Sequence, residues 1–193
     1  CFQQAGIPVG PWLAIGSHQW PRHSDELLTR IREELRFPVY VKPSRGGSSV
    51  GIARVAEPQN LPEAIEHARR FDPKVIVEQG IVGGREVECA VREAVPGEPQ
   101  ASVPGEIAMH ANDGFYDYKA KYLPHGEVEL RVPAPMDDAA RRRVQELAVR
   151  CFTALDCAGL ARVDLFLMPD GEVFGNEINT LPGFTALSLD PSL

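Results

Sequence analysis

Two acidic residues occupy facing positions of a predicted β-hairpin, where their carboxylates could hold a metal ion. The hairpin covers residues 161–179, in which two apolar-alternating runs are separated by Asp170-Gly171, a strong turn signal. With these two residues at the centre of the turn, Asp164 lies directly opposite Glu177 on the neighbouring strand. Two carboxylates placed in this way repel each other, so the pair requires a compensating positive charge.

The same register places Arg162 opposite Asn179, on the face of the hairpin that carries both carboxylates. Mg²⁺ is a hard cation that prefers oxygen ligands, and two carboxylates with one amide oxygen supply them. Because Mg²⁺ in proteins usually also bridges to substrate phosphates, this face is predicted to hold a nucleotide as well. The alternative is a plain ion pair, in which Arg162 neutralises Asp164 or Glu177.

A Gly- and Ser-rich segment, residues 44–51, follows a predicted strand that ends near Lys42. Backbone N–H groups of such a segment can surround a phosphate, and Lys42 can add a positive charge. The sequence contains neither a P-loop nor a G-x-G-x-x-G motif, so the two common nucleotide-binding loops are not indicated. Taken alone, the segment fits an ordinary Gly-Ser turn beside a solvated lysine at least as well.

Two more acidic residues stand near a Gly-rich joint at residues 82–84. Glu78 ends a predicted strand and could accept a hydrogen bond from an adenine amino group, whereas Glu86 could accept hydrogen bonds from ribose hydroxyls. Solvated carboxylates at strand ends explain both residues at least as well.

A polar stretch at residues 108–127 shows no sustained periodicity, and a loop of this length is usually a lid or a binding loop. Within it, residues 115–122 are rich in lysine and tyrosine. Lys121 beside Tyr122 suits the capture of an anion when a lid closes. Tyrosines packed in a core are the alternative.

Helices and strands alternate through the rest of the chain. Capping residues and apolar periodicity predict helices that start at Ser24, Asn60 and Asp137 and end near residues 35, 71 and 155. Strands are predicted at residues 39–41, 50–55, 75–78, 86–92, 162–167 and 173–179. The joint at residues 82–84 separates two expected α+β units, residues 1–81 and 82–193.

Composition excludes several classes of protein. The chain carries 20 Lys and Arg against 27 Asp and Glu, for a net charge of −7, which argues against a nucleic-acid binder held by a basic surface. No apolar run is long enough to span a bilayer, so we expect a soluble protein with no membrane partner. The four cysteines form no C-x-x-C pair, which favours reduced thiols and a cytoplasmic location.

Taken together, these segments resemble the ATP-grasp ligases, and within them the D-alanine–D-alanine ligase family. The segments that carry the resemblance are residues 41–51, 115–122, 161–164 and 176–185. The first and the last of them are highly specific in combination, and the resemblance covers nearly the whole chain.

The resemblance implies an α+β ATP-grasp fold of two subdomains, with the nucleotide held in the cleft between their sheets. It implies that ATP phosphorylates the carboxylate of one D-alanine and that the amine of a second D-alanine then displaces phosphate. The product, D-alanyl-D-alanine, serves peptidoglycan precursor synthesis. The implied cofactors are ATP and two Mg²⁺ ions, with Mn²⁺ as a substitute, and the implied assembly is a homodimer.

The resemblance also assigns a role to each candidate site residue. Asp164 and Asn179 each hold one Mg²⁺ and Glu177 bridges both, while Arg162 and the backbone N–H of Gly183 stabilise the oxyanion of the tetrahedral intermediate. The residues implied to bind the nucleotide are Lys42, Ser49, Glu78, Ile81, Glu86, Lys121 and Phe166. Ser48 and Tyr122 join the lid to the Gly-Ser segment, and Ser188 and Leu189 bind the carboxylate of the second D-alanine.

Several alternatives stay open beside this interpretation. They are another ATP-grasp carboxylate–amine ligase, a D-alanine–D-lactate ligase, a nucleotide-binding module without turnover and a generic acidic interaction domain. The Lys-Ala-Lys-Tyr ending of the lid favours an amine over a hydroxyl as the second nucleophile. The chain starts without Met and has no counterpart of the family's N-terminal domain or closing helix, so we expect a fragment that binds Mg-ATP weakly and ligates poorly.

Overall fold

The computed structural model describes residues 1–109 and 128–183, which form two compact units. One unit comprises residues 10–81, and the second unit joins residues 1–9 to the described residues after 81. The sequence assigned residues 1–9 to the first unit, whereas they pack with the second. Ile7 is buried in the core of the second unit, and the Gly175 amide donates a 2.8 Å hydrogen bond to the Pro8 carbonyl.

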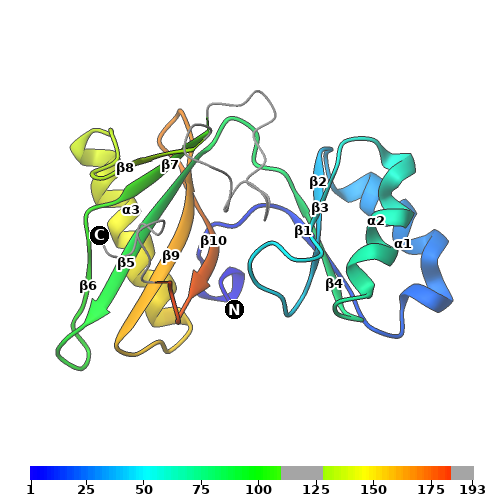
Figure 1. Ribbon diagram of the computed structural model, residues 1–193, viewed down its shortest axis with the longest axis horizontal. Coiled ribbons are helices and arrows are strands. Elements are labelled where there is room, and N and C mark those ends of the chain that lie inside the picture. The colour runs from blue at the N-terminus through cyan, green and yellow to red at the C-terminus, as the bar shows by residue number, and fades with distance from the viewer. Residues whose placement is uncertain (110–127, 184–193) are drawn as a thin grey trace. The chain divides into compact units, whose positions relative to one another are not determined.

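The first unit is a four-stranded antiparallel sheet with two helices on one face (Figure 1). Across the sheet lie β1 (Trp12–Ile15), β4 (Val75–Gln79), β2 (Val39–Pro43) and β3 (Ala53–Val55). The short η2 (Pro58–Asn60) leads into α2 (Leu61–Arg69), which lies beside α1 (Trp20–Glu34). Val41 and Val77 are fully buried in the core beneath the helices, so the alternate residues of these strands lie on the opposite face.

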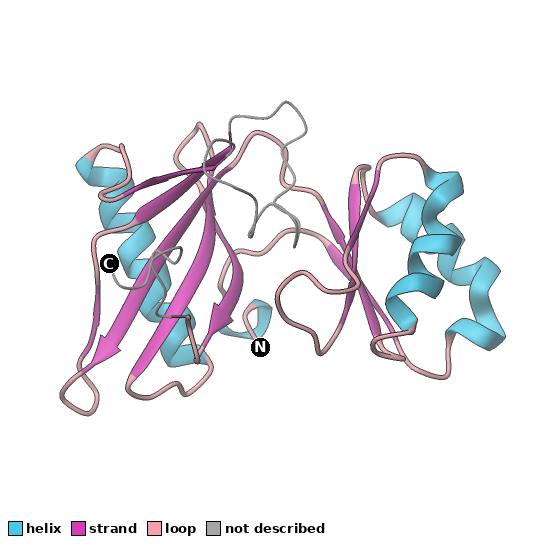
Figure 2. Cartoon of the chain, viewed as in Figure 1, coloured by secondary structure: helices cyan, strands magenta, loops and turns pink. Residues whose placement is uncertain are grey.

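The second unit is a six-stranded antiparallel sheet with one long helix on one face (Figure 2). Its strands are, in spatial order, β10 (Val173–Asn179), β9 (Leu160–Leu167), β5 (Arg85–Glu93), β7 (Gly105–Met109) and β8 (Val128–Arg131), with β6 (Pro99–Ala101) paired to β5. The helix α3 (Asp138–Ala154) packs on the face that carries Val87, Val163 and Leu165, and η1 (Gln3–Ala5) precedes β1 in the chain. The other face of β5, β9 and β10 therefore carries their polar residues.

The predicted helices and strands are present with shifted ends. Residues 50–52 were predicted as strand but belong to a turn, because Gly51 has a φ of 77° and the Val50 amide bonds to the Gly47 carbonyl. The helix predicted from Ser24 begins earlier, at Trp20, with a break in helical backbone at His23. None of the described helices combines the length and the apolar character needed to cross a membrane.

The start of α3 provides a test of the local folding argument. The Asp137 side chain accepts a 2.7 Å hydrogen bond from the Ala140 amide, which confirms the helix start expected there. We expect Asp137→Ala to lower the free energy of unfolding by about 1 kcal/mol, measured by urea denaturation. Asp138→Ala is the matched control, because the exposed Asp138 side chain caps no amide; an equal loss in both variants would contradict the cap.

Candidate functional site

The β9–β10 hairpin brings together the four polar residues that the sequence predicted on one face. Asp164 pairs with Glu177, and Arg162 pairs with Asn179. On β9 the residues alternate between buried and half-buried, and Arg162 and Asp164 fall on the face opposite α3. The predicted juxtaposition is therefore confirmed.

The turn of this hairpin differs from the prediction, although the pairing is the predicted one. The Gly171 amide donates to the Met168 carbonyl, and Gly171 has a φ of 84°, so three residues rather than two form the loop. The three-residue loop shifts the pairing next to the turn by one position. A β-bulge between Gly175 and Glu177 shifts it back before the acidic pair is reached.

A third carboxylate, which sequence reasoning missed, lies in the same row. Glu88 of β5 pairs with Asp164 of β9, so Glu88, Asp164 and Glu177 occupy adjacent positions on three neighbouring strands. Glu88 is buried, whereas Glu177 is exposed. The predicted strand at residues 86–92 contained the signal, because Glu86 and Glu88 are two residues apart and share one face.

Arg162 supplies positive charge to this row of carboxylates. Its Nε and Nη2 atoms donate hydrogen bonds of 2.6 and 2.8 Å to the two carboxylate oxygens of Asp164, and Nε lies 3.4 Å from Glu88 Oε2. Within residues 1–109 and 128–183, no group of three or more His, Cys, Asp or Glu side chains is arranged to hold a metal. The geometry therefore has the ion-pair arrangement, while the carboxylates still provide the hard oxygen atoms that Mg²⁺ prefers.

The chain turns sharply after β10. The Asn179 Oδ1 atom accepts a 3.0 Å hydrogen bond from the Leu181 amide, an Asx-type turn that directs the side chain toward its own backbone. An amide oxygen has a second lone pair, so Asn179 keeps one acceptor position for another partner. Gly183 lies exposed beyond this turn.

Glu86 and Phe166 are direct neighbours across β5 and β9. Phe166 stands two residues from Asp164 on β9 and so shares its face of the sheet. The structure thus brings the predicted ribose and adenine contacts of this unit together, beside the carboxylate row.

In the first unit, Lys42 of β2 and Glu78 of β4 form an ion pair on the sheet face opposite the helices. Their side chains are 23% and 33% exposed, so both remain accessible to a ligand. Ile81 follows β4 and is half-buried. The predicted phosphate-binding lysine and the predicted adenine-binding carboxylate are therefore in direct contact.

The segment of residues 44–51, which we call the flap, forms a tight turn between β2 and β3. Ser48 and Ser49 have φ values of 52° and 57°, and the Val50 amide donates a 3.1 Å hydrogen bond to the Gly47 carbonyl. Positive φ at both central residues is the mark of a type I′ turn. Such a backbone is unfavourable for residues with a side chain, so the surrounding structure must hold it.

Two buried carboxylates outside the predicted site are held by arginines. Asp72 accepts hydrogen bonds of 2.9–3.0 Å from the Arg45 amide and guanidinium and from the Lys74 amide, and the bond to the guanidinium is the main cause that holds the pKa of Asp72 well below its usual range. Glu106 of β7 accepts a 2.6 Å hydrogen bond from Arg85, which lowers the pKa of Glu106. Both carboxylates are therefore charged partners within the fold.

Four predicted site residues lie outside the described residues. They are Lys121, Tyr122, Ser188 and Leu189.

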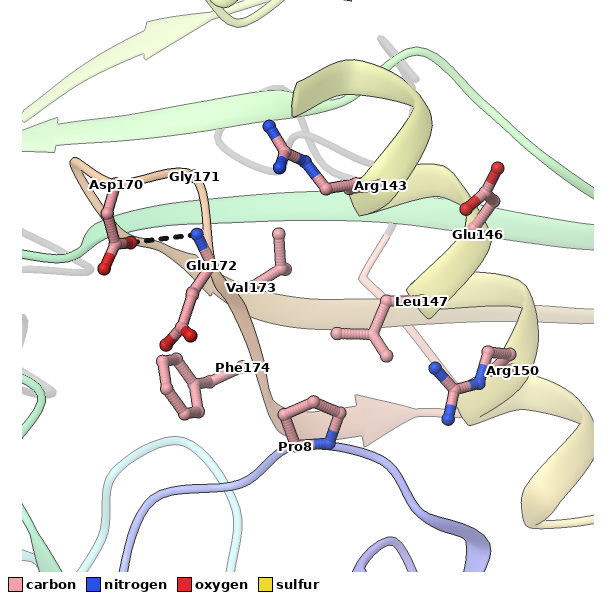
Figure 3. Close-up of a pocket in the computed structure, with 10 residues that line it drawn as sticks. All are labelled: Pro8, Arg143, Glu146, Leu147, Arg150, Asp170, Gly171, Glu172, Val173 and Phe174. Carbon is pink, nitrogen blue, oxygen red and sulfur yellow. Dashed lines mark hydrogen bonds between the residues drawn. The ribbon is translucent and has the colours of Figure 1, made fainter. Parts of the chain in front are cut away.

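A pocket of about 500 Å³ lies in the second unit, between α3 and the β9–β10 turn (Figure 3). Arg143 and Arg150 line it from α3, and Asp170 and Glu172 line it from the turn. Its lining includes none of the described residues that the sequence predicted for the site, so the pocket is not that site.

Comparison with known proteins identifies a family over the whole chain. The family model described as D-ala D-ala ligase C-terminus matches residues 1–193. A D-alanine--D-alanine ligase of Mycolicibacterium gilvum (strain PYR-GCK) is 50% identical over 98% of this chain and 50% of its own length. One of Paenarthrobacter aurescens (strain TC1) is 46% identical over 100% of this chain and 51% of its own length. The chain thus spans about half the length of these relatives.

Solved structures give the same result at the level of the fold. The VanG D-Ala:D-Ser ligase from Enterococcus faecalis is 39% identical, with a TM-score of 0.81 over 96% of this chain and 51% of that protein. The D-alanyl-alanine synthetase A from Vibrio cholerae is 31% identical, with a TM-score of 0.80 over 98% of this chain and 56% of that protein.

Proposed function

The chain belongs to the D-Ala–D-Ala ligase C-terminal family, and we propose that it forms the nucleotide- and metal-binding part of an ATP-dependent ligase that joins two D-alanine molecules. Its fold is the α+β fold of its ATP-grasp relatives. The observation that carries the proposal is the family match over all 193 residues. The polar face of β5, β9 and β10 supports it, because residues that the resemblance singled out meet there.

In the proposed reaction, a carboxylate oxygen of the first D-alanine attacks the γ-phosphorus of ATP, so an acyl phosphate forms and ADP leaves. The amine of the second D-alanine then attacks the carbonyl carbon; a C–N bond forms, phosphate departs and the amine loses a proton. Both steps develop negative charge that fixed cations and N–H donors must stabilise. We assign this work to Lys42, Lys121, Arg162 and the Gly183 amide.

Asp164, Glu177 and Asn179 would hold the magnesium ions of the site. When bound, these ions neutralise phosphate charge and orient the phosphoryl group for transfer. Glu177 is suited to this role because its carboxylate is exposed. Arg162 would share Asp164 with the metal and keep Glu88 as its second partner.

The remaining residues of the proposed site bind the nucleotide, the lid or the second substrate. Ser49, Glu78, Ile81, Glu86 and Phe166 would contact ATP, Ser48 would bond Tyr122 of the lid, and Ser188 and Leu189 would bind the second D-alanine. The wider proposal is a homodimeric cytoplasmic enzyme of peptidoglycan precursor synthesis.

Magnesium-dependent nucleotide binding is the first test. At a nucleotide concentration about one hundred times Kd, we expect Mg-ATP to raise the unfolding midpoint of this chain by about 5–10 °C. Excess EDTA should abolish the shift, because it removes the Mg²⁺ that the carboxylate row is proposed to bind. Thermal unfolding with ATP, Mg-ATP and Mg-ATP plus EDTA checks this, and a shift that survives EDTA would contradict the metal assignment.

Substrate class is tested by phosphate release from the whole protein. D-Alanine should give the highest rate, and D-serine belongs in the panel because one solved relative is a D-Ala:D-Ser ligase. D-Lactate should act poorly if the lid favours an amine. Nucleotide binding without phosphate release on any of these substrates would replace the ligase by a nucleotide-binding module.

A further inference from the structure

We infer that Asp72, together with Phe71, is a positioning residue for the flap, because the two residues hold its two ends. Both residues follow α2 in the chain and contact the flap without being part of it. This inference rests on the proposed function, in which the flap binds the phosphates of ATP. Neither residue belongs to the predicted nucleotide contacts, so their effect would be exerted through the shape of the flap.

Asp72 holds the first end of the flap. Its side chain is 2% exposed, and its two oxygens accept four hydrogen bonds, three from Arg45 and one from the Lys74 amide. Four bonds use all the acceptor positions of a carboxylate. The Ser44 amide adds a 2.9 Å hydrogen bond to the Lys74 carbonyl, so the chain enters the flap along a fixed path.

Phe71 holds the second end of the flap. Gly51 has a φ of 77°, and a Cβ atom placed on it would lie 2.4 Å from Phe71 Cδ2 and 2.9 Å from Pro43 Cγ. The Phe71 ring therefore lies against the backbone of Gly51, where no side chain fits. His67 supports the ring from α2, in an edge contact with 5.3 Å between ring centroids.

The middle of the flap depends on these two ends. Gly46, Gly47 and Ser48 are exposed and so gain little from packing, while Ser48 and Ser49 keep an unfavourable positive φ. A turn of this kind holds its shape where its surroundings over-determine it, and the contacts that do so lie at residues 45 and 51. A loop already shaped for its ligand binds more tightly, because less ordering is needed on binding.

Asp72→Asn tests the inference with almost no change in volume. An amide has donors on one side, so two donors of Arg45 or Lys74 must then face an NH₂ group. We expect trypsin to cut the Arg45–Gly46 bond about tenfold faster in the absence of nucleotide, since cleavage follows the population of the open flap. We expect the KM for ATP of the whole protein to rise by about tenfold with little change in kcat, since ATP binding is weakened.

Asp25→Asn is the matched control, an exposed aspartate on α1 of the same unit, and both quantities should stay unchanged there. Cleavage needs no nucleotide, so it tests the positioning role even where Mg-ATP binding by the unchanged protein fails. An unchanged cleavage rate at Arg45–Gly46 overturns the inference. A fall in kcat with unchanged KM also overturns it, because that pattern reports loss of folded protein rather than a reshaped flap.

Phe71→Ala keeps the inference testable if Asp72→Asn does not fold. The Phe71 side chain is 51% exposed, so its removal should spare the core of the unit. We expect about a threefold rise in cleavage at Arg45–Gly46 and in the KM for ATP, because one end of the flap stays attached through Asp72. If neither quantity rises, Phe71 does not position the flap. If Asp72→Asn also fails to fold, that result overturns the whole inference.

Discussion

Replacing Glu177 with glutamine should lower ATP-dependent phosphate release in the presence of D-alanine by at least about a hundredfold, because groups that support a bound metal already cost 10–100-fold when lost. Glutamine keeps the size of the side chain and removes the charge that would bind both cations. Glu177 is exposed, so the substitution should leave the unfolding midpoint unchanged. Phosphate release as a function of Mg²⁺ concentration measures the effect, and the concentration for half-maximal rate should rise.

Glu172→Gln is the matched control for this experiment. Glu172 is an exposed glutamate on the same hairpin, beside the three-residue turn. Its substitution by glutamine removes the same charge, but away from the carboxylate row. We expect its phosphate release and magnesium dependence to match those of the unchanged protein. If Glu177→Gln behaved like Glu172→Gln, the carboxylate row would not be the metal site.

The hairpin shows how far short-range sequence signals reach. Alternation along both strands correctly placed Asp164 opposite Glu177, because the side-chain period of a strand is two residues. The predicted turn length was wrong, because the loop has three residues instead of two. The predicted pairing is nevertheless present, since the bulge after Gly175 reverses the one-residue shift that the longer loop causes. Bulges of this kind depend on packing between strands, and local sequence does not report it.

Contacts between distant segments were beyond the sequence argument. Glu88 joined the carboxylate row because β5 lies beside β9, and Asp72 reached the flap across 27 residues of chain. Neither pairing has a local spacing that indicates it. A different limit, short length, explains why strands β1, β6, β7 and β8 were missed. Each is three to five residues long and offers little alternation to detect.

The choice between a metal ion and an ion pair also needed side-chain positions. Both alternatives use the same backbone register, so the spacing of Arg162, Asp164 and Glu177 fits each of them. The structure shows Arg162 bound to Asp164 through both carboxylate oxygens. Under the proposed function, a bound Mg²⁺ would share the Asp164 oxygens with Arg162, so the ion pair does not by itself decide against the metal.

Arg162→Met should lower the free energy of unfolding of the protein by about 3 kcal/mol, the lower end of the range for breaking a buried ion pair. The Glu88 and Asp164 side chains are 9% and 15% exposed, so both would lose a cation where water replaces it poorly. Urea denaturation measures the loss. The same variant should have no detectable phosphate release, because the proposed oxyanion loses its guanidinium partner.

Arg92→Met is the control, because Arg92 lies on β5 of the same sheet and is exposed. It should cost less than about 0.5 kcal/mol, the usual range for a surface substitution. Adding Glu88→Gln to Arg162→Met should recover part of the loss, since the carboxylate row then carries one negative charge fewer. Equal losses for Arg162→Met and Arg92→Met would show that Arg162 does not balance the row.

Magnesium should restore part of the stability that Arg162→Met loses. Once the guanidinium is gone, the row of Glu88, Asp164 and Glu177 has lost the positive charge that Arg162 brings to Glu88 and Asp164. A ligand that binds the folded state alone stabilises that state. We expect a rise in the urea midpoint of Arg162→Met with millimolar Mg²⁺, and a smaller rise in the unchanged protein, where Arg162 occupies Asp164. The opposite order would mean that the guanidinium and the metal do not share these oxygens, and the metal would then have to be placed elsewhere in the protein.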